Sequence, residues 1–354
     1  MPRRLVLASA LAVPALVLAG CSSTDAPDAG AEDGAGFSIV ASTSVYASLL
    51  SELVGDAADV TAIVDSPTQD PHSYEATTRD QLAVQQADLV VRNGGGYDPF
   101  MDQLTEEAGT EHVITVVEYS HDYPGAESHA EGEHAEDEHA EDEHAEDEQA
   151  ETATPETAAP ESEATEEAHD HEHEGHDHIE GFNEHVWYDP HTIAHLVEEL
   201  GAELGELLPD AASDIQVAQE ELLADIDGLE SALDEVATAH EGAHVFFTEP
   251  VGGYLAAAAG LEDATTEGFA EAVEEGQDVA PATLLAALDA IEGGEIDVLI
   301  TNTQTAGAET QRVIEAAEGA GVPVIEYAET LPDGDTYVSW MTANIEALEQ
   351  ALAG

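Results

Sequence analysis

Short apolar runs rich in β-branched residues alternate with amphipathic helical patterns from about residue 37 to the end of the chain. The apolar runs predict strands at 37–41, 60–64, 87–92, 113–117, 244–248, 296–301 and 322–326. Helical patterns fall between them at 45–54, 78–86, 281–291, 308–319 and 336–352. Strands and helices that alternate in this way are typical of parallel sheets covered by helices on both faces. We therefore expect an α/β protein of two lobes, each a parallel sheet flanked by helices.

One long helical pattern, at about 209–239, separates the two halves. Its apolar residues recur at intervals of three, four or seven: Ile215, Leu222, Ile226, Leu229, Leu233 and Val236. About 30 residues at 1.5 Å each make a rod of roughly 45 Å, which would restrain closure of the lobes about a hinge. A coiled-coil dimer seam is the alternative, but the pattern is short and the chain has no lysine for flanking charge pairs. We expect a monomer with lobes at 37–208 and 241–354 and a linking helix at 209–240.

The amino terminus predicts export and lipid anchoring. Arg3 and Arg4 precede an apolar run at 5–19, which is shorter than the about 20 residues that cross a bilayer as a helix. The run ends in Leu-Ala-Gly-Cys, which resembles a bacterial lipobox, and Cys21 is the only cysteine. We expect a signal peptide at 1–20, a diacylglycerol on Cys21 and a flexible tether at 21–36. This would place the protein on the outer face of the cytoplasmic membrane.

The strongly acidic composition excludes nucleic acids as partners. The chain has 5 Lys+Arg against 79 Asp+Glu, and no lysine. Nothing in such a chain could neutralise the phosphates of a nucleic acid. The acidic residues are spread over the whole sequence, which indicates an acid-biased or salt-adapted proteome.

A histidine-rich acidic segment at 121–180 interrupts the first half. Its composition predicts a disordered loop. Beyond His121, its histidines are His129, His134, His139, His144, His169, His171, His173, His176 and His178. Imidazole suits zinc, copper, nickel and iron, so this histidine tract is expected to collect metal. A solvated acidic linker is the alternative.

Candidate ligands outside the tract follow predicted strands or lie in loops. His72 lies in "DSPTQDPHSYEAT", His185 in "NEHVWYDPHT" and Glu249 in "FFTEPVGGYLAAAAGL". Ligands in parallel α/β folds gather at the carboxyl ends of strands. Asn302 and Gln304 also end a strand, where they could orient ligands or cap the loop. His191 and His195 stand four apart after Pro190, a spacing that can pair on zinc or mark an exposed helix face.

These stretches, with "DPHSYEATTRDQLAVQQADLVVRNGGGYDPFMDQL" and "VPVIEYAETLPDGDTYVSWM", resemble the metal-binding lipoproteins of bacterial ABC importers for zinc and manganese, the cluster A-I solute-binding proteins. The resemblance covers about 38–352 and implies two α/β lobes joined by a long helix. It implies that the metal ligands are His72, His185 and Glu249, with a fourth at Glu329. Because the family's usual position is displaced here, Asp333 and Asp335 remain alternatives for the fourth ligand.

The resemblance implies a protein that captures metal and delivers it to an ABC permease with its ATPase. Two imidazoles and two carboxylates can hold Zn²⁺, or Mn²⁺ if the carboxylates are bidentate. These ligand types alone slightly favour manganese, but the histidine tract favours zinc, since Mn²⁺ binds imidazole weakly. A metal buffer, an adhesin and a zinc hydrolase are alternatives, but H-E-x-x-H, P-loop and G-x-S-x-G motifs are absent from the sequence. We therefore expect a zinc carrier and no enzyme.

Overall fold

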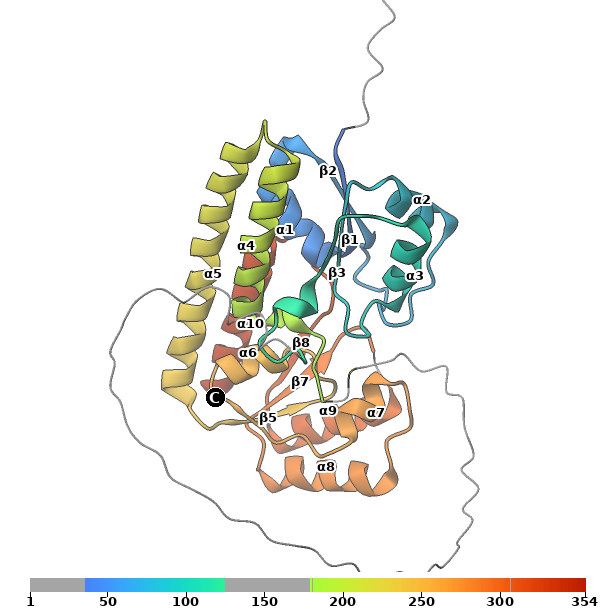
Figure 1. Ribbon diagram of the computed structural model, residues 1–354. Coiled ribbons are helices and arrows are strands. Elements are labelled where there is room, and N and C mark those ends of the chain that lie inside the picture. The colour runs from blue at the N-terminus through green and yellow to red at the C-terminus, as the bar shows by residue number, and fades with distance from the viewer. Residues whose placement is uncertain (1–35, 125–178, 180, 306) are drawn as a thin grey trace, which may run out of the picture. The chain divides into compact units, whose positions relative to one another are not determined.

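The computed structural model describes residues 36–124, 179, 181–305 and 307–354 (Figure 1). The predicted signal peptide, Cys21, the tether up to residue 35 and the tract histidines from His129 to His178 lie outside the described residues. Within the described part, no helix is both long enough and apolar enough to cross a membrane.

The first lobe is a four-stranded parallel sheet in the order β2-β1-β3-β4. Its strands are β1 (Ser38–Thr43), β2 (Asp59–Val64), β3 (Leu89–Arg92) and β4 (Val113–Thr115). Its helices are α1 (Ser44–Val54), α2 (Thr78–Gln86), α3 (Pro99–Ala108) and α4 (Pro190–Leu207). In register, Ile39 of the central strand β1 pairs with Val60 and Leu89. The carboxyl ends of all four strands therefore face one edge of the lobe.

The second lobe repeats this topology, with the parallel order β6-β5-β7-β8. Its strands are β5 (His244–Phe247), β6 (Glu262–Asp263), β7 (Val298–Asn302) and β8 (Val324–Tyr327). Its helices are α6 (Gly253–Ala258), α7 (Phe269–Glu274), α8 (Pro281–Gly293) and α9 (Ala308–Ala320). The expected α/β class, with two lobes that are each a parallel sheet flanked by helices, is confirmed.

The differences from the expected elements have local causes. The edge strand β6 has two exposed acidic residues and no hydrophobic pattern, so only its pairing with β5 reveals it. The strand expected at 113–117 ends at Thr115, because Val116 and Val117 are buried in a 3₁₀ turn, η2 (Val116–Tyr119). The helices α6 and α7 have six residues each, which is too short for a clear period.

The expected long helix is present as α5 (Ala212–His240), between the two sheets in sequence (Figure 1). The residues that bury its apolar stripe are those of the sequence pattern: Ile215, Leu222, Ile226, Leu229, Leu233 and Val236. This stripe packs α5 against α4, α1 and α10 (Tyr337–Leu352). The last helix, α10, follows the second sheet in sequence but packs against α5 and α1 of the first lobe. It therefore bridges the lobes, which the sequence division did not anticipate.

Aromatic side chains join the lobes next to these helices. The Tyr337 hydroxyl donates to the backbone oxygen of Trp187 at 2.9 Å. Tyr188 stacks on Tyr327 with ring centroids 5.3 Å apart. All four rings belong to one buried apolar cluster that includes strands of both sheets. The lobes thus share a continuous core, which opposes large movements between them.

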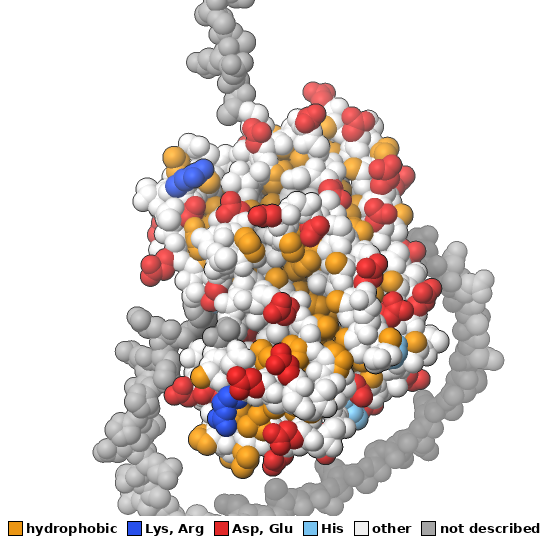
Figure 2. Space-filling model, turned by 180° about the vertical axis from the view of Figure 1, so that it is seen from behind, with side chains coloured by type: hydrophobic (Ala, Val, Ile, Leu, Met, Phe, Trp, Pro, Cys, Tyr) orange, Lys and Arg blue, Asp and Glu red, His pale blue; other side chains and the backbone are white. Residues whose placement is uncertain are grey.

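Acidic side chains are scattered over the visible surface without forming one patch, and the basic side chains occupy only small areas (Figure 2). This distribution agrees with the global excess of Asp and Glu in the sequence.

Candidate metal site

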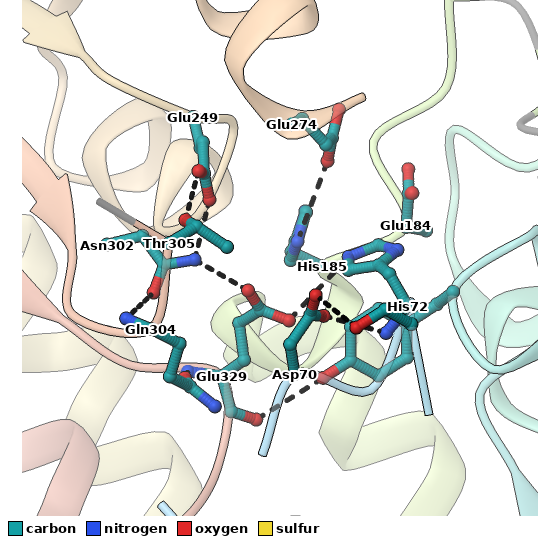
Figure 3. A network of polar contacts seen from close by, with 12 residues as sticks. Asp70, His72, Glu184, His185, Glu249, Glu274, Asn302, Gln304, Thr305 and Glu329 are labelled. Carbon is teal, nitrogen blue, oxygen red and sulfur yellow. Dashed lines mark hydrogen bonds and ion pairs between the residues drawn. The ribbon is translucent and has the colours of Figure 1, made fainter. Parts of the chain in front are cut away.

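Buried polar residues from both lobes meet at the carboxyl ends of the strands (Figure 3). His72 follows β2, and His185 precedes the 3₁₀ turn η4 (Val186–Tyr188). Glu329 follows β8. One ligand atom each of His72, His185 and Glu329 lies within 4.8 Å of the others. The structure therefore brings three of the four expected ligands into a group that could hold one ion.

A tight turn positions His72. The His72 backbone N donates to Asp70 Oδ1 at 2.9 Å, and the Ser73 hydroxyl donates to Asp70 Oδ2 at 2.8 Å. The imidazole packs edge-on against Tyr97, with ring centroids 4.8 Å apart. Its Nε2 lies 3.6 Å from Glu329 Oε2. The turn and the ring contact thus aim Nε2 of His72 at a carboxylate of the other lobe.

An amide fixes the tautomer of His185. His185 Nδ1 lies 2.8 Å from Asn183 Oδ1, and Asn183 Nδ2 donates to Pro250 O at 3.0 Å. Because the amide oxygen only accepts, Nδ1 of His185 carries the proton and Nε2 presents its lone pair. A hydrogen bond of this kind orients a metal-binding imidazole and makes it more basic. The Tyr254 hydroxyl, which donates to the backbone oxygen of Asn183 at 2.9 Å, holds the arrangement in place.

Asn302, the last residue of β7, connects two glutamates. Its Nδ2 lies 2.6 Å from both Glu249 Oε2 and Glu329 Oε1. Thr305 also donates its hydroxyl to Glu249. Both oxygens of Glu249 are therefore engaged, and this residue is not in the group with the histidines among the described residues. The expected ligand Glu249 thus lies beside the group, joined to it through Asn302.

Glycine is required in the loop that carries Glu249. Gly252 has φ +83°, and a Cβ there would lie 2.4 Å from the ring of Tyr327. The left-handed conformation and the close approach both exclude a larger residue. The loop after β5 therefore depends on Gly252.

A carboxylate that the sequence did not reveal faces His185. Glu274, the last residue of α7, places Oε1 3.8 Å from His185 Nε2 (Figure 3). It also forms a second possible metal-holding group with His72 and Glu184. Nothing in "FAEAVEEG" separates Glu274 from the glutamates around it, because only the packing of α7 selects it.

The three candidates for the expected fourth ligand, all after β8, differ in burial. Glu329 is 1% exposed, whereas Asp333 and Asp335 are exposed. Gln304 accepts from the backbone N of Glu329 at 2.6 Å and donates to Gln69 O of the first lobe at 2.8 Å. The geometry therefore selects Glu329 and gives Gln304 an orienting contact.

Burial, together with the charges of nearby carboxylates, raises the pKa of all three glutamates. Burial first, and the charge of Glu249 second, raise the pKa of Glu329 to about 8. Burial raises the pKa of Glu249 to about 7, although Thr305 and Asn302 oppose the rise. Burial and then Glu184 raise the pKa of Glu274 to about 9. Carboxylates crowded in this way are stabilised in their ionised form by a cation.

The donor set suits a transition ion. Two imidazole nitrogens and one carboxylate oxygen are ligands that zinc accepts in a tetrahedral site. Glu249 and Glu274, on either side, offer further oxygens of the kind that manganese prefers. The site can therefore hold a divalent ion, and its carboxylates leave both metals chemically open.

The fold and the site define a class: a two-lobed binding protein with imidazole and carboxylate groups converging between its lobes. A family model described as ZnuA, the periplasmic component A of a zinc-uptake complex, matches residues 39–351, and the chain belongs to this family. Members of the family are solute-binding proteins and not enzymes.

One relative by sequence is named for manganese. The manganese-binding lipoprotein MntA of Halalkalibacterium halodurans is 36% identical over 104 residues, which cover 29% of this chain and 34% of that protein. The aligned stretch thus spans about a third of this curated relative.

Solved structures share the fold at low identity. A crystal structure of ZnuA is 17% identical with a TM-score of 0.62, covering 90% of this chain and 99% of that one. The periplasmic zinc-binding protein TroA of Treponema pallidum is 17% identical with a TM-score of 0.64, covering 89% and 98%. The binding protein FpvC of Pseudomonas aeruginosa, in complex with Mn²⁺, is 17% identical with a TM-score of 0.62, covering 90% and 98%.

Proposed function

We propose that this protein captures Zn²⁺ between its lobes outside the cytoplasm and delivers it to the permease of an ABC importer. The observation that carries the proposal is the convergence of His72, His185 and Glu329 within 4.8 Å, from loops far apart in the chain. The family's description as a zinc-uptake component supports the same reading.

The proposed primary ligands are His72, His185 and Glu329. A fourth ligand would come from Glu249, as the sequence resemblance implies, or from Glu274, which lies nearer to His185. Glu249 would have to exchange its contact with Thr305 or Asn302 for the ion. Glu274 would only have to move toward His185, so it competes with Glu249 for this role.

Manganese is the second candidate, and specific observations favour it. Three glutamates lie at the site, and oxygen ligands suit Mn²⁺. MntA, a relative by sequence, is named for manganese. We favour zinc because the two imidazoles are its preferred ligands and because the histidine tract is rich in imidazole.

The proposal extends to the segments outside the described residues. Cys21 would carry a lipid that holds the protein at the outer face of the cytoplasmic membrane. The tract histidines from His129 to His178 would collect zinc near the cleft. The residues around these histidines support this position: Tyr123, before His129, packs edge-on against Phe182, after His178, with ring centroids 5.6 Å apart.

Competition between the two metals tests the proposal. The full chain is stripped with a chelator, and Zn²⁺ and Mn²⁺ are titrated by calorimetry against wild type and His185→Ala. We expect a tight zinc site that disappears in the variant, and tract binding that is weaker and the same in both proteins. A tight manganese site lost in His185→Ala, with no tight zinc site, would favour the second candidate. A tight site that survives in His185→Ala would reject the ligand set.

A further inference from the structure

Two histidines lie together on α4, outside the cleft. His191 and His195 are one turn apart, and their side chains are 61% and 50% exposed. Their Nε2 atoms are 3.3 Å apart, and their rings meet at 83° with centroids 4.7 Å apart. The opposite face of the helix is buried through Ile193, Leu196 and Val197, so the backbone under the pair is fixed.

The separation of the two nitrogens matches a shared ion. Two nitrogens that each lie about 2.0 Å from a tetrahedral zinc are roughly 3.3 Å apart. The Nε2 atoms of His191 and His195 already have this spacing. Because the pair is exposed, water can complete the coordination of an ion.

A glutamate carboxylate lies near Nδ1 of each of the two rings. His191 Nδ1 lies 3.5 Å from Glu230 Oε1 of α5, and His195 Nδ1 lies 3.5 Å from Glu198 Oε2. A carboxylate at this position favours the tautomer with its proton on Nδ1, as it does behind the histidines of zinc sites. The two Nε2 lone pairs then face each other and repel unless a cation lies between them.

A direct hydrogen bond between the rings is the competing explanation. Between two neutral imidazoles, it would require one of them to carry its proton on Nε2, which turns a bare Nδ1 lone pair toward Glu230 or Glu198. That arrangement places a lone pair against a carboxylate. For two neutral imidazoles, a metal ion satisfies all four groups at once, whereas the hydrogen bond leaves one of them opposed.

We propose that His191 and His195 form a second metal site, on the surface, for divalent ions that prefer imidazole: zinc, copper or nickel. Mn²⁺, at the bottom of the affinity series and suited to oxygen ligands, does not occupy it. Glu230 and Glu198 orient the two rings. The site is independent of the cleft, because it shares no ligand with His72, His185 or Glu329.

Residue-resolved chemical protection tests this site in the full chain, despite the other histidines. Diethyl pyrocarbonate modifies free imidazole nitrogens, and fragment mass spectra locate each modified histidine. With Zn²⁺ at ten times its Kd for the His191–His195 pair, modification of these two residues should slow roughly tenfold, because only the metal-free fraction reacts. Mn²⁺ at the same concentration should protect neither residue. Protection should persist in His72→Ala, where the cleft is damaged.

Matched controls decide the outcome. In His195→Ala, His191 should lose its protection, and Glu230→Gln should weaken zinc binding at the pair by about tenfold. His112 is the internal control, since it is an exposed imidazole with Nδ1 2.6 Å from Glu203 Oε1. An unchanged modification rate with Zn²⁺, equal protection of His112, or protection of His191 that survives His195→Ala would each overturn the proposal.

Discussion

Tyr188 and Ala328 join the two lobes through a single hydroxyl. The Tyr188 hydroxyl donates to Ala328 O at 2.7 Å and accepts from Ala328 N at 3.2 Å. Tyr188 lies three residues after His185, and Ala328 precedes Glu329 directly. This pair therefore helps to set the distance between a proposed ligand of the first lobe, His185, and a proposed ligand of the second, Glu329.

Removing that hydroxyl should weaken metal binding without unfolding the protein. In Tyr188→Phe, zinc affinity should fall by about 10–100-fold, the usual cost of losing an outer contact that positions a ligand. Calorimetry on the metal-free chain measures the change. Tyr74→Phe is the control, because it removes a hydroxyl that donates to Asp80 within the first lobe and not to the second lobe. A zinc affinity in Tyr188→Phe equal to that of the control would show that the contact between Tyr188 and Ala328 does not position Glu329.

The fourth ligand can be assigned by two matched substitutions. Glu249→Gln and Glu274→Gln each remove one charge and keep the size of the side chain. Substitution of the residue that binds the ion should lower zinc affinity by more than roughly 100-fold, the upper cost of losing an outer contact. Substitution of the other residue should lower it by less. Competition with a fluorescent chelator measures both constants. Equal small losses would mean that neither carboxylate binds the ion and that water completes its coordination.

The raised pKa values predict how the metal-free protein responds to pH. The folded pKa values of Glu249, Glu329 and Glu274, about 7, 8 and 9, exceed the ordinary glutamate value of 4.5. The folded state therefore holds more protons, and the stability contributed by these groups falls as the pH rises above 4.5 and is lost once the pH passes the folded values of about 7, 8 and 9. The melting temperature in chelator should decrease from pH 6 to pH 9.

Two further measurements test that cause. The same melting series on Glu329→Gln should show a smaller decrease, because this variant lacks one of the three titrating groups. Zinc affinity should instead rise with pH over this range, since the ion displaces protons from its ligands. A metal-free protein that becomes more stable toward pH 9 would contradict the assigned shifts.

The linking helix allows a test of the shared core. Leu229→Ala removes a side chain that is 3% exposed on α5, and should lower the free energy of unfolding by about 2–5 kcal/mol. Val217→Ala, on the same helix but 54% exposed, should change it by less than about 0.5 kcal/mol. Urea denaturation measures both variants. Similar values for the two would mean that the stripe of α5 does not contribute to the core.

The hydrophobic pattern along the chain predicted the two parallel sheets and the long helix. The apolar stripe of α5 predicted the buried face of the helix residue by residue, because a helix places every third or fourth side chain on one side. The parallel sheets followed from the alternation of strands and helices. The short elements β6, α6 and α7 were missed, since two to six residues show no period.

For the site too, the sequence predicted one part and only the structure revealed the rest. The sequence by itself determined His72, His185, Glu249 and Glu329 as candidates, through strand ends, turn residues and a family resemblance. Only the tertiary structure decided that Glu329 meets the two histidines, that Asn302 and Thr305 hold Glu249, and that Glu274 faces His185. The reason is physical: a turn or a period is a property of neighbours along the chain, whereas ligand distances depend on how the two lobes and α7 pack together.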